Sequence, residues 1–169
     1  MEGELPIIGD DSAVFDYSCD AVELVNGLGS VGDTRLRTDI FNKFKNWGYS
    51  FRSVIHPAAV VADTCVLGEG VQVMAGVIIN VGTHIATDTI VNTGAVIDHD
   101  CMIGSHVHIA PGVTISGGVQ VGDCSHIGTG ATIIQGVTIG NRALIGAGAV
   151  VINDVADGQK VVGVPAKEL

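Results

Sequence analysis

The chain has 169 residues, 47% of them hydrophobic, 15% charged and 24 of them glycine, a composition that fits one globular domain with a small appendage and excludes a disordered segment. The formal net charge is −10 and no basic residue stands between positions 53 and 141, which argues against nucleic-acid binding because phosphate contacts need clustered Lys and Arg. No apolar run approaches the length of a membrane span and no basic, apolar leader opens the chain, so we expect a cytoplasmic protein without a membrane partner.

The first 52 residues are predicted to form a small, incomplete, partly Rossmann-like α/β domain that binds substrate. A short apolar strand at residues 21–25 leads into a glycine-rich loop and then a helix at residues 34–47. Asp33 is expected to cap that helix and Gly48 to end it. The loop glycines match a dinucleotide-binding fingerprint by letter, but no acid-bearing second strand follows. The milder interpretation is a backbone that approaches a phosphate or sugar at a helix N-terminus, and the alternative is a tight turn.

Residues 53–169 carry a six-residue repeat. An aliphatic residue stands at every sixth position from Ile55 to Val151, and a small or compact residue stands two positions before each one. This spacing puts both columns on the inward face of a short strand, while the remaining positions, rich in Gly, Asn and Asp, are typical of turns. An α-helical period cannot keep such a repeat on one face, and β-branched residues dominate, so the pattern predicts strands.

This repeat resembles that of the hexapeptide-repeat transferases, a left-handed parallel β-helix in which three hexads close one triangular coil of 18 residues. The left hand is implied by the resemblance alone, since the general crossover rule favours the opposite hand. The resemblance also implies a homotrimer with ligand sites between adjacent prisms.

His99 is the strongest candidate for chemistry. It lies in a predicted corner between Asp98 and Asp100, two residues beyond an inward isoleucine. A carboxylate beside an imidazole fixes its tautomer and raises its basicity, which suits a base acting on an amine or hydroxyl that attacks a thioester. Gly117, 18 residues later, is expected to lie over the ring with a bare N–H that could stabilise an oxyanion. A solvated corner histidine among surface acids is the alternative.

A zinc site is the second possibility. His108 and His126 are 18 residues apart and should stack on successive coils. Hexapeptide prisms include a carbonic anhydrase class, a zinc hydrolyase whose metal is held by histidines of two subunits. Its pair of histidines separated by four residues is missing from this sequence, so we expect no metal.

Residues 92–101 and 163–167 resemble the sugar acetyltransferases of the sialic acid O-acetyltransferase and bacillosamine-type nucleotide-sugar N-acetyltransferase group. The likeness covers the whole prism and part of the first 52 residues. It implies transfer of an acetyl group from acetyl-CoA to an amine or hydroxyl of a sugar or nucleotide-sugar, in bacterial surface polysaccharide biosynthesis. Whether nitrogen or oxygen is acetylated, which sugar is used and whether it carries a nucleotide stay open.

The resemblance also implies roles for single residues. His99 would be the general base, Asp100 would increase its basicity, and Gly117 would offer its N–H to the thioester oxygen. The residues that would face the acceptor are Gly29, Asn92 and Asp98. The residues that would bind acetyl-CoA are His108, Thr129 and Ala147, with Arg142, Lys160 and Lys167 as candidates for its phosphates.

The sequence departs from the family pattern at its front. Family members usually open with a strand, a glycine-rich loop carrying a histidine and a pair of acids, which hold a nucleotide. This sequence starts after that point, so we expect either a natural short form or a truncated one. A non-catalytic trimeric scaffold therefore remains a third hypothesis.

Overall fold

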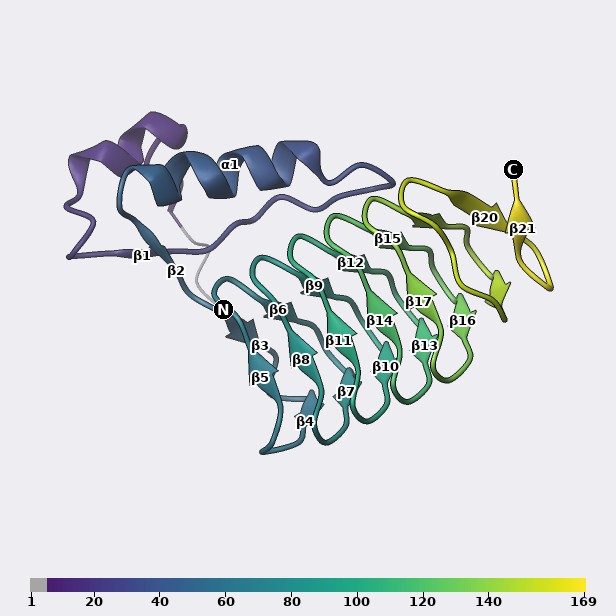
Figure 1. The fold of residues 1–169 in the computed structure, drawn as a ribbon. Helices are drawn as coiled ribbons and strands as arrows, with labels where there is room; N and C mark the ends of the chain where they lie inside the picture. The colour runs from purple at the N-terminus through teal and green to yellow at the C-terminus, as the bar shows by residue number, and fades with distance from the viewer. Residues whose placement is uncertain (1–5) are drawn as a thin grey trace.

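The computed structural model describes residues 6–169 as a small α/β unit followed by a long β-helical prism (Figure 1). Residues 1–5, part of the predicted first domain, lie outside the described residues. The elements of the α/β unit are the 3₁₀ helix η1 (Asp11–Asp16), strand β1 (Glu23–Leu24), helix α1 (Arg35–Asn46) and strand β2 (Ser50–Phe51). β1 and β2 pair in parallel, so the unit is a minimal βαβ motif whose second strand the sequence analysis missed. In the described part of the chain, no helix combines the length and hydrophobicity needed to cross a bilayer.

Helix α1 starts and ends close to its predicted limits. The predicted cap is wrong, because Thr34 and not Asp33 holds the N-cap position, and the Thr34 side chain makes no capping hydrogen bond. The Asp33 carboxylate, one residue earlier, instead accepts the N–H of Arg35 at 2.9 Å and so still satisfies one free donor of the first turn. Gly48, with φ of +90°, ends the helix as predicted, since the left-handed conformation favours glycine.

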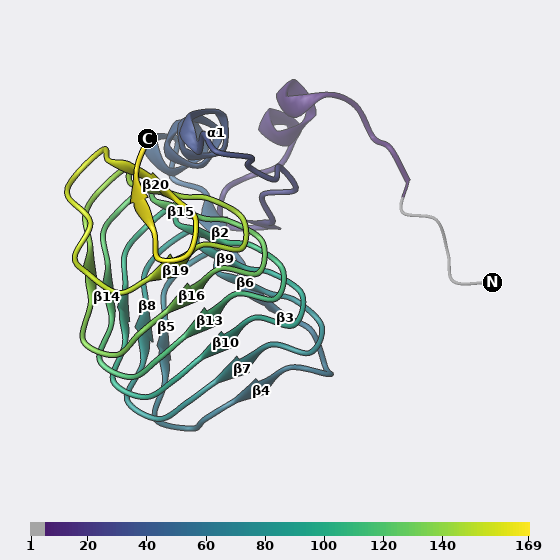
Figure 2. The same cartoon turned by 90° about the vertical axis from the view of Figure 1, so that its right-hand side faces the viewer.

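Three parallel sheets form the faces of the prism (Figures 1 and 2). Face 1 consists of β3 (Val54–Ile55), β6 (Gln72–Val73), β9 (Ile90–Val91), β12 (His108–Ile109), β15 (His126–Ile127), β18 (Leu144–Ile145) and β20 (Lys160–Val162), with β21 (Lys167–Glu168) antiparallel at its end. Face 2 consists of β4 (Val60–Val61), β7 (Ile78–Ile79), β10 (Val96–Ile97), β13 (Thr114–Ile115), β16 (Thr132–Ile133) and β19 (Val150–Val151). Face 3 consists of β5 (Val66–Leu67), β8 (His84–Ile85), β11 (Met102–Ile103), β14 (Gln120–Val121) and β17 (Thr138–Ile139).

Each prism strand pairs in register with the strand one coil later. Val96 lies opposite Thr114, and Ile97 lies opposite Ile115, 18 residues further along. The coils wind in the left-handed sense, so the predicted parallel β-helix is confirmed. Because the register is constant, residues 18 apart form columns along the prism, and the sequence positions of a column identify its neighbours.

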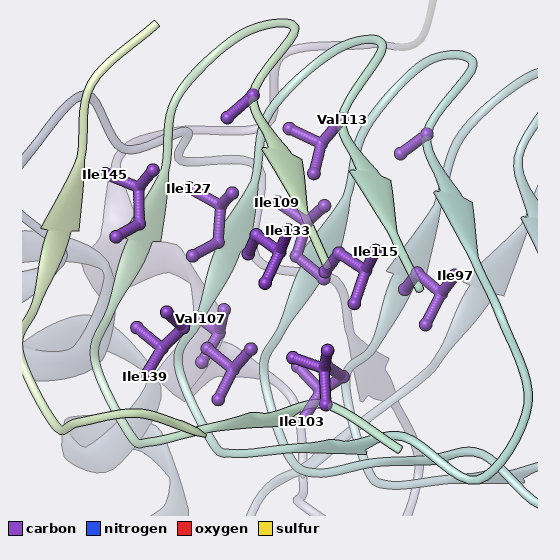
Figure 3. Packing of buried hydrophobic residues seen from close by; sticks show 14 of the residues in the cluster. Ile97, Ile103, Val107, Ile109, Val113, Ile115, Ile127, Ile133, Ile139 and Ile145 are labelled. Atoms are coloured by element: carbon purple, nitrogen blue, oxygen red, sulfur yellow. The ribbon is translucent and has the colours of Figure 1, made fainter. Parts of the chain in front are cut away.

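The two predicted inward columns form the core of the prism. Figure 3 shows the isoleucines of successive coils pointing into the interior, and Ile97, Ile115 and Ile133 are all 0% exposed. The first coil is different, since Ile55 is 48% exposed although it belongs to the same column. No coil lies beneath it, so only the later coils are packed from both sides.

The α/β unit covers face 1. Outward-facing side chains of that face are buried, at 4% exposure for Ile90 and 7% for His108, whereas Val60 on face 2 is 63% exposed. Figure 2, which looks along the prism, shows α1 lying against the side that carries β9 and β15. The unit has its own small core of Phe41, Phe44, Tyr49 and Phe51. It therefore lies on the prism as a packed layer.

Candidate active site

The His99 corner is the turn that joins face 2 to face 3. β10 ends at Ile97, and the chain turns through residues 98–100 before β11 begins. An open pocket of about 600 Å³ lies at this corner, lined by residues 98–100, 116–118 and 135–136 of three successive coils. The His99 side chain is 55% exposed, so the imidazole is accessible to a ligand from this pocket.

Asp100 holds the imidazole of His99. The Nδ1–H of His99 donates to Oδ2 of Asp100 at 2.9 Å, which leaves the Nε2 lone pair free. This hydrogen bond, followed by the negative charge of Asp98, raises the pKa of His99 above its ordinary value. The pair therefore provides an exposed imidazole of increased basicity.

The backbone makes this pairing possible at a tight corner. Asp100 has φ of +57°, in the left-handed region, which Asp tolerates better than most residues. In the coil below, Gly82 occupies the matching position with φ of +72°, and a Cβ there would collide with Oδ1 of Asp100. Gly82 thus leaves the space that the Asp100 carboxylate fills.

Asp98 is held from two sides. Its Oδ1 accepts the backbone N–H of His99 at 2.9 Å and the Nδ2–H of Asn80 at 3.0 Å. The hydrogen bond from the His99 backbone, then that from Asn80, lowers the pKa of Asp98, so it stays ionised. Sequence reasoning missed Asn80, although its place 18 residues before Asp98 could have identified it as a column neighbour. Oδ2 of Asp98 accepts no hydrogen bond from residues 6–169.

Gly117 lies directly over the imidazole, where counting by 18 placed it. A Cβ built on Gly117 would come within 2.6 Å of both Cε1 and Nε2 of His99. The next N–H, of Gly118, is used by the His99 carbonyl at 2.9 Å, whereas the N–H of Gly117 has no acceptor within residues 6–169. A free backbone donor therefore lies beside the exposed base.

His108 lies on β12, under the loop of the α/β unit. Its Nδ1 is 2.5 Å from the carbonyl oxygen of Ser30, and its Nε2 is 3.2 Å from Nδ2 of Asn92. Burial lowers the pKa of His108, so the ring is neutral. Two of the predicted ligand-binding residues, His108 and Asn92, are thus brought together by the fold.

Thr129 and Ala147 lie at a different corner from His99. They belong to the turns that join face 1 to face 2, here called the Thr129 corner, where the Gly148 N–H donates to the Thr129 carbonyl at 2.8 Å. Both side chains are exposed. One copy of the chain therefore does not bring these two residues together with His99.

The remaining predicted residues are more scattered. Arg142 and Lys160 line one pocket near the N-terminus of α1, while Lys167 is exposed on β21. Gly29 is exposed, and a Cβ there would meet nothing within 4 Å. Nothing in the described chain tests their predicted contacts with phosphate or sugar.

The histidines of the prism are engaged in other contacts than metal binding. Nδ1 of His106 lies 3.0 Å from Oδ2 of Asp88, and Nδ1 of His108 faces Ser30. Within residues 6–169 no group of three His, Cys, Asp or Glu side chains is arranged to hold a metal ion.

Comparison with known proteins adds independent information. Residues 118–153 match the Hexapep family, described as bacterial transferase hexapeptide (six repeats). The chain is 35% identical over 94 residues to GDP-perosamine N-acetyltransferase of Escherichia coli O157:H7, an overlap of 56% of this chain and 42% of that enzyme. It thus spans less than half the length of that curated relative.

Two solved structures are similar over a larger share of their length. The acetyltransferase domain of PglB from Neisseria gonorrhoeae FA1090, in complex with acetyl coenzyme A, is 36% identical, with 100% of this chain and 82% of that chain covered and a TM-score of 0.90. PerB from Caulobacter crescentus, in complex with CoA and GDP-perosamine, is 47% identical, with 82% and 67% covered and a TM-score of 0.80. From the left-handed prism, the repeat and these relatives, we conclude that the chain belongs to the hexapeptide-repeat family of sugar acetyltransferases.

Proposed function

We propose that this chain catalyses transfer of an acetyl group from acetyl-CoA to the amino group of a nucleotide-linked sugar. The observation that carries the proposal is the exposed His99–Asp100 pair beneath the free N–H of Gly117. The relatives support it, since their names describe N-acetyltransferases and their complexes contain acetyl-CoA, or CoA with GDP-perosamine. Such a reaction belongs to the biosynthesis of bacterial surface glycans.

In the proposed mechanism, His99 acts as general base. The amine nitrogen attacks the thioester carbonyl carbon while Nε2 of His99 takes a proton from that nitrogen. The carbonyl oxygen becomes an oxyanion and accepts a hydrogen bond from the Gly117 N–H. When the intermediate collapses, the carbon–sulfur bond breaks, and the thiolate of CoA receives the proton from the imidazolium. The products are the N-acetylated sugar and free CoA thiol.

The charges around His99 support nitrogen over oxygen as the acceptor atom. Asp98 and Asp100 flank the imidazole, and an amino sugar brings a positive charge or strong N–H donors to such a site, which a hydroxyl does not. Oδ2 of Asp98 is free to receive an N–H, and Asn92 and Gly29 are proposed as further acceptor contacts. An acceptor of the sialic acid type, acetylated on oxygen, lacks this charge match.

A homotrimer is proposed because one copy holds only part of the site. Thr129 and Ala147, proposed to line the pantetheine channel together with His108, lie at another corner than His99. Large apolar side chains near the His99 corner are exposed, with Val81 at 55% and Met102 at 51%. Packing the Thr129 corner of one prism against the His99 corner of the next would cover this surface and complete the site.

The domain division and the compartment are also proposed. Residues 1–52 would contribute to acceptor binding and residues 53–169 to acetyl transfer, with Arg142, Lys160 and Lys167 near the CoA phosphates. All four cysteines are free thiols, which suits the reducing cytoplasm, where acetyl-CoA is available.

The test is thiol release by purified protein with acetyl-CoA and a panel of amino-sugar nucleotides, compared with free sialic acid. We expect turnover with an amino-sugar nucleotide and none after His99→Ala. Turnover with sialic acid alone would refute the choice of nitrogen. Stoichiometric zinc by elemental analysis would favour the hydrolyase, and a melting temperature unchanged by acetyl-CoA would favour the scaffold, since a ligand of the folded state must raise it.

A further inference from the structure

A buried ion pair joins the α/β unit to the prism. Arg37 of α1 is 2% exposed and Asp88 is 0% exposed, and the guanidinium NH2 lies 2.7 Å from Oδ1 of Asp88. Asp88 sits at a corner between faces 3 and 1 with φ of +55°, and its Oδ2 pairs with Nδ1 of His106. Burying two charges carries a desolvation cost that a pair of apolar side chains would avoid. A role other than stability is therefore worth seeking.

The same guanidinium holds the loop that follows β1. Its NH1 donates to the carbonyl oxygen of Asn26 at 2.9 Å and also to that of Leu28, while its Nε donates to the carbonyl of Asp88 at 3.2 Å. In return, Nδ2 of Asn26 donates to the Arg37 carbonyl at 3.1 Å. Only the planar fork of arginine reaches several acceptors at once, so a lysine could keep the ion pair but not these loop contacts.

Beyond Leu28 the loop meets two stacked imidazoles on face 1. The ring centroids of His108 and His126 are 5.0 Å apart. The carbonyl oxygen of Ser30 is 2.5 Å from Nδ1 of His108, and the N–H of Gly32 is 3.4 Å from Nδ1 of His126. A carbonyl oxygen can only accept and an N–H can only donate, so the loop makes opposite demands on the two rings.

These demands assign opposite tautomers. His108 carries its proton on Nδ1 and has a lone pair on Nε2, whereas His126 has a bare Nδ1 and carries its proton on Nε2. Both rings are neutral, since burial lowers the pKa of His108, and burial together with His108 lowers the pKa of His126 to about 4. Nε2 of His108 then accepts from Nδ2 of Asn92, whose Oδ1 is occupied by the Thr93 N–H at 2.8 Å.

We propose that Arg37, clamped by Asp88, is a positioning residue for acetyl transfer, because it holds the loop that presents His108 as a hydrogen-bond acceptor at Nε2. The inference rests on the proposed function for its kinetic consequence only. A ligand group that meets this nitrogen must carry an N–H or O–H, as the amides of pantetheine do. Loosening the loop would let His108 adopt the other tautomer and weaken acetyl-CoA binding.

The experiment combines nitrogen NMR of the full-length protein, with ¹⁵N-labelled histidine, and steady-state kinetics. In the wild type we expect a protonated Nδ1 for His108 and a protonated Nε2 for His126, assigned by His108→Gln and His126→Gln. Arg37→Lys should yield a mixture of tautomers at His108 and raise KM for acetyl-CoA about tenfold. The acid limb of the pH profile should stay in place, because the His99–Asp100 pair is untouched. Arg52→Lys, at an exposed ion pair with Glu23, is the matched control.

Wild-type His108 protonated on Nε2 would overturn the inference whether or not the protein turns over any sugar. Unchanged tautomers and a KM within twofold of wild type in folded Arg37→Lys would overturn it as well. If Arg37→Lys does not fold, Asp88→Asn keeps the shape and tolerates the left-handed backbone, and the same shift at His108 is required of it. Loss of activity without the tautomer shift would count against Proposed function rather than support this positioning role.

Discussion

Replacing Gly117 by Ala should reduce turnover strongly while leaving the protein stable. A methyl group at this position would come within 2.6 Å of Cε1 and Nε2 of His99 and within 3.1 Å of Cδ2. Since carbon atoms prefer separations of about 3.5 to 4.0 Å, the imidazole must retreat by about 1 Å. A misplacement of that size can cost about 10² in rate, equivalent to about 2.7 kcal/mol of activation free energy.

The folded state should tolerate this methyl group. Gly117 does not have the left-handed backbone that penalises alanine, and the group that it displaces is an exposed side chain. The alanine also restricts the unfolded chain, an effect worth about 0.4–1 kcal/mol in favour of the folded state. We therefore expect a melting temperature close to that of the wild type.

Gly158→Ala is the matched control with the opposite signature. Gly158 has φ of +69° and nothing within 4 Å of a built Cβ, so alanine would strain the backbone by about 1–2 kcal/mol without touching His99. Thiol release with acetyl-CoA and thermal unfolding are measured on both variants. A kcat for Gly117→Ala within threefold of the wild type, or a loss of stability equal to that of Gly158→Ala, would refute the reasoning.

Three further substitutions test the base, its partner and the core. His99→Ala should lower kcat by about 10² or more while acetyl-CoA still raises the melting temperature, and undiminished turnover would exclude His99 as the base. Asp100→Asn should move the acid limb of kcat/KM to lower pH: the base works only when neutral, activity is lost as pH falls through a pKa that Asp100 raises, and removing that charge returns the pKa toward 6.5. A limb that stays in place would mean that another group titrates there. Ile115→Ala should destabilise the protein by about 2–5 kcal/mol, because Ile115 is 0% exposed between two occupied coils, and a loss below 1 kcal/mol in denaturant unfolding would contradict that packing.

The prism could be predicted from the sequence because its contacts follow from counting. A β-helical coil of 18 residues touches only the coils above and below, so residues 18 apart are neighbours throughout. This is why the burial of Ile97 and the position of Gly117 over His99 were both predictable. It is also why Asn80 could have been found beside Asp98.

The α/β unit could be predicted only in part. Its helix was expected within one residue, since helix signals are local, but strand β2 was missed because a two-residue strand carries no periodicity. The docking of the unit on face 1 depends on Arg37 meeting Asp88, 51 residues later, and on Ser30 meeting His108, 78 residues later. No local pattern encodes contacts of that separation.

The sequence by itself determined the repeat, the parallel strands, the inward columns and the acid-flanked histidine, since each is set by the spacing of neighbouring residues. Only the tertiary structure decided which face the α/β unit covers, which tautomer each stacked histidine adopts, and that Thr129 and Ala147 lie at another corner than His99. The physical reason is that these features depend on how a separately folded layer packs on the prism and on the turn that each residue occupies. A linear periodicity carries the first kind of information and not the second.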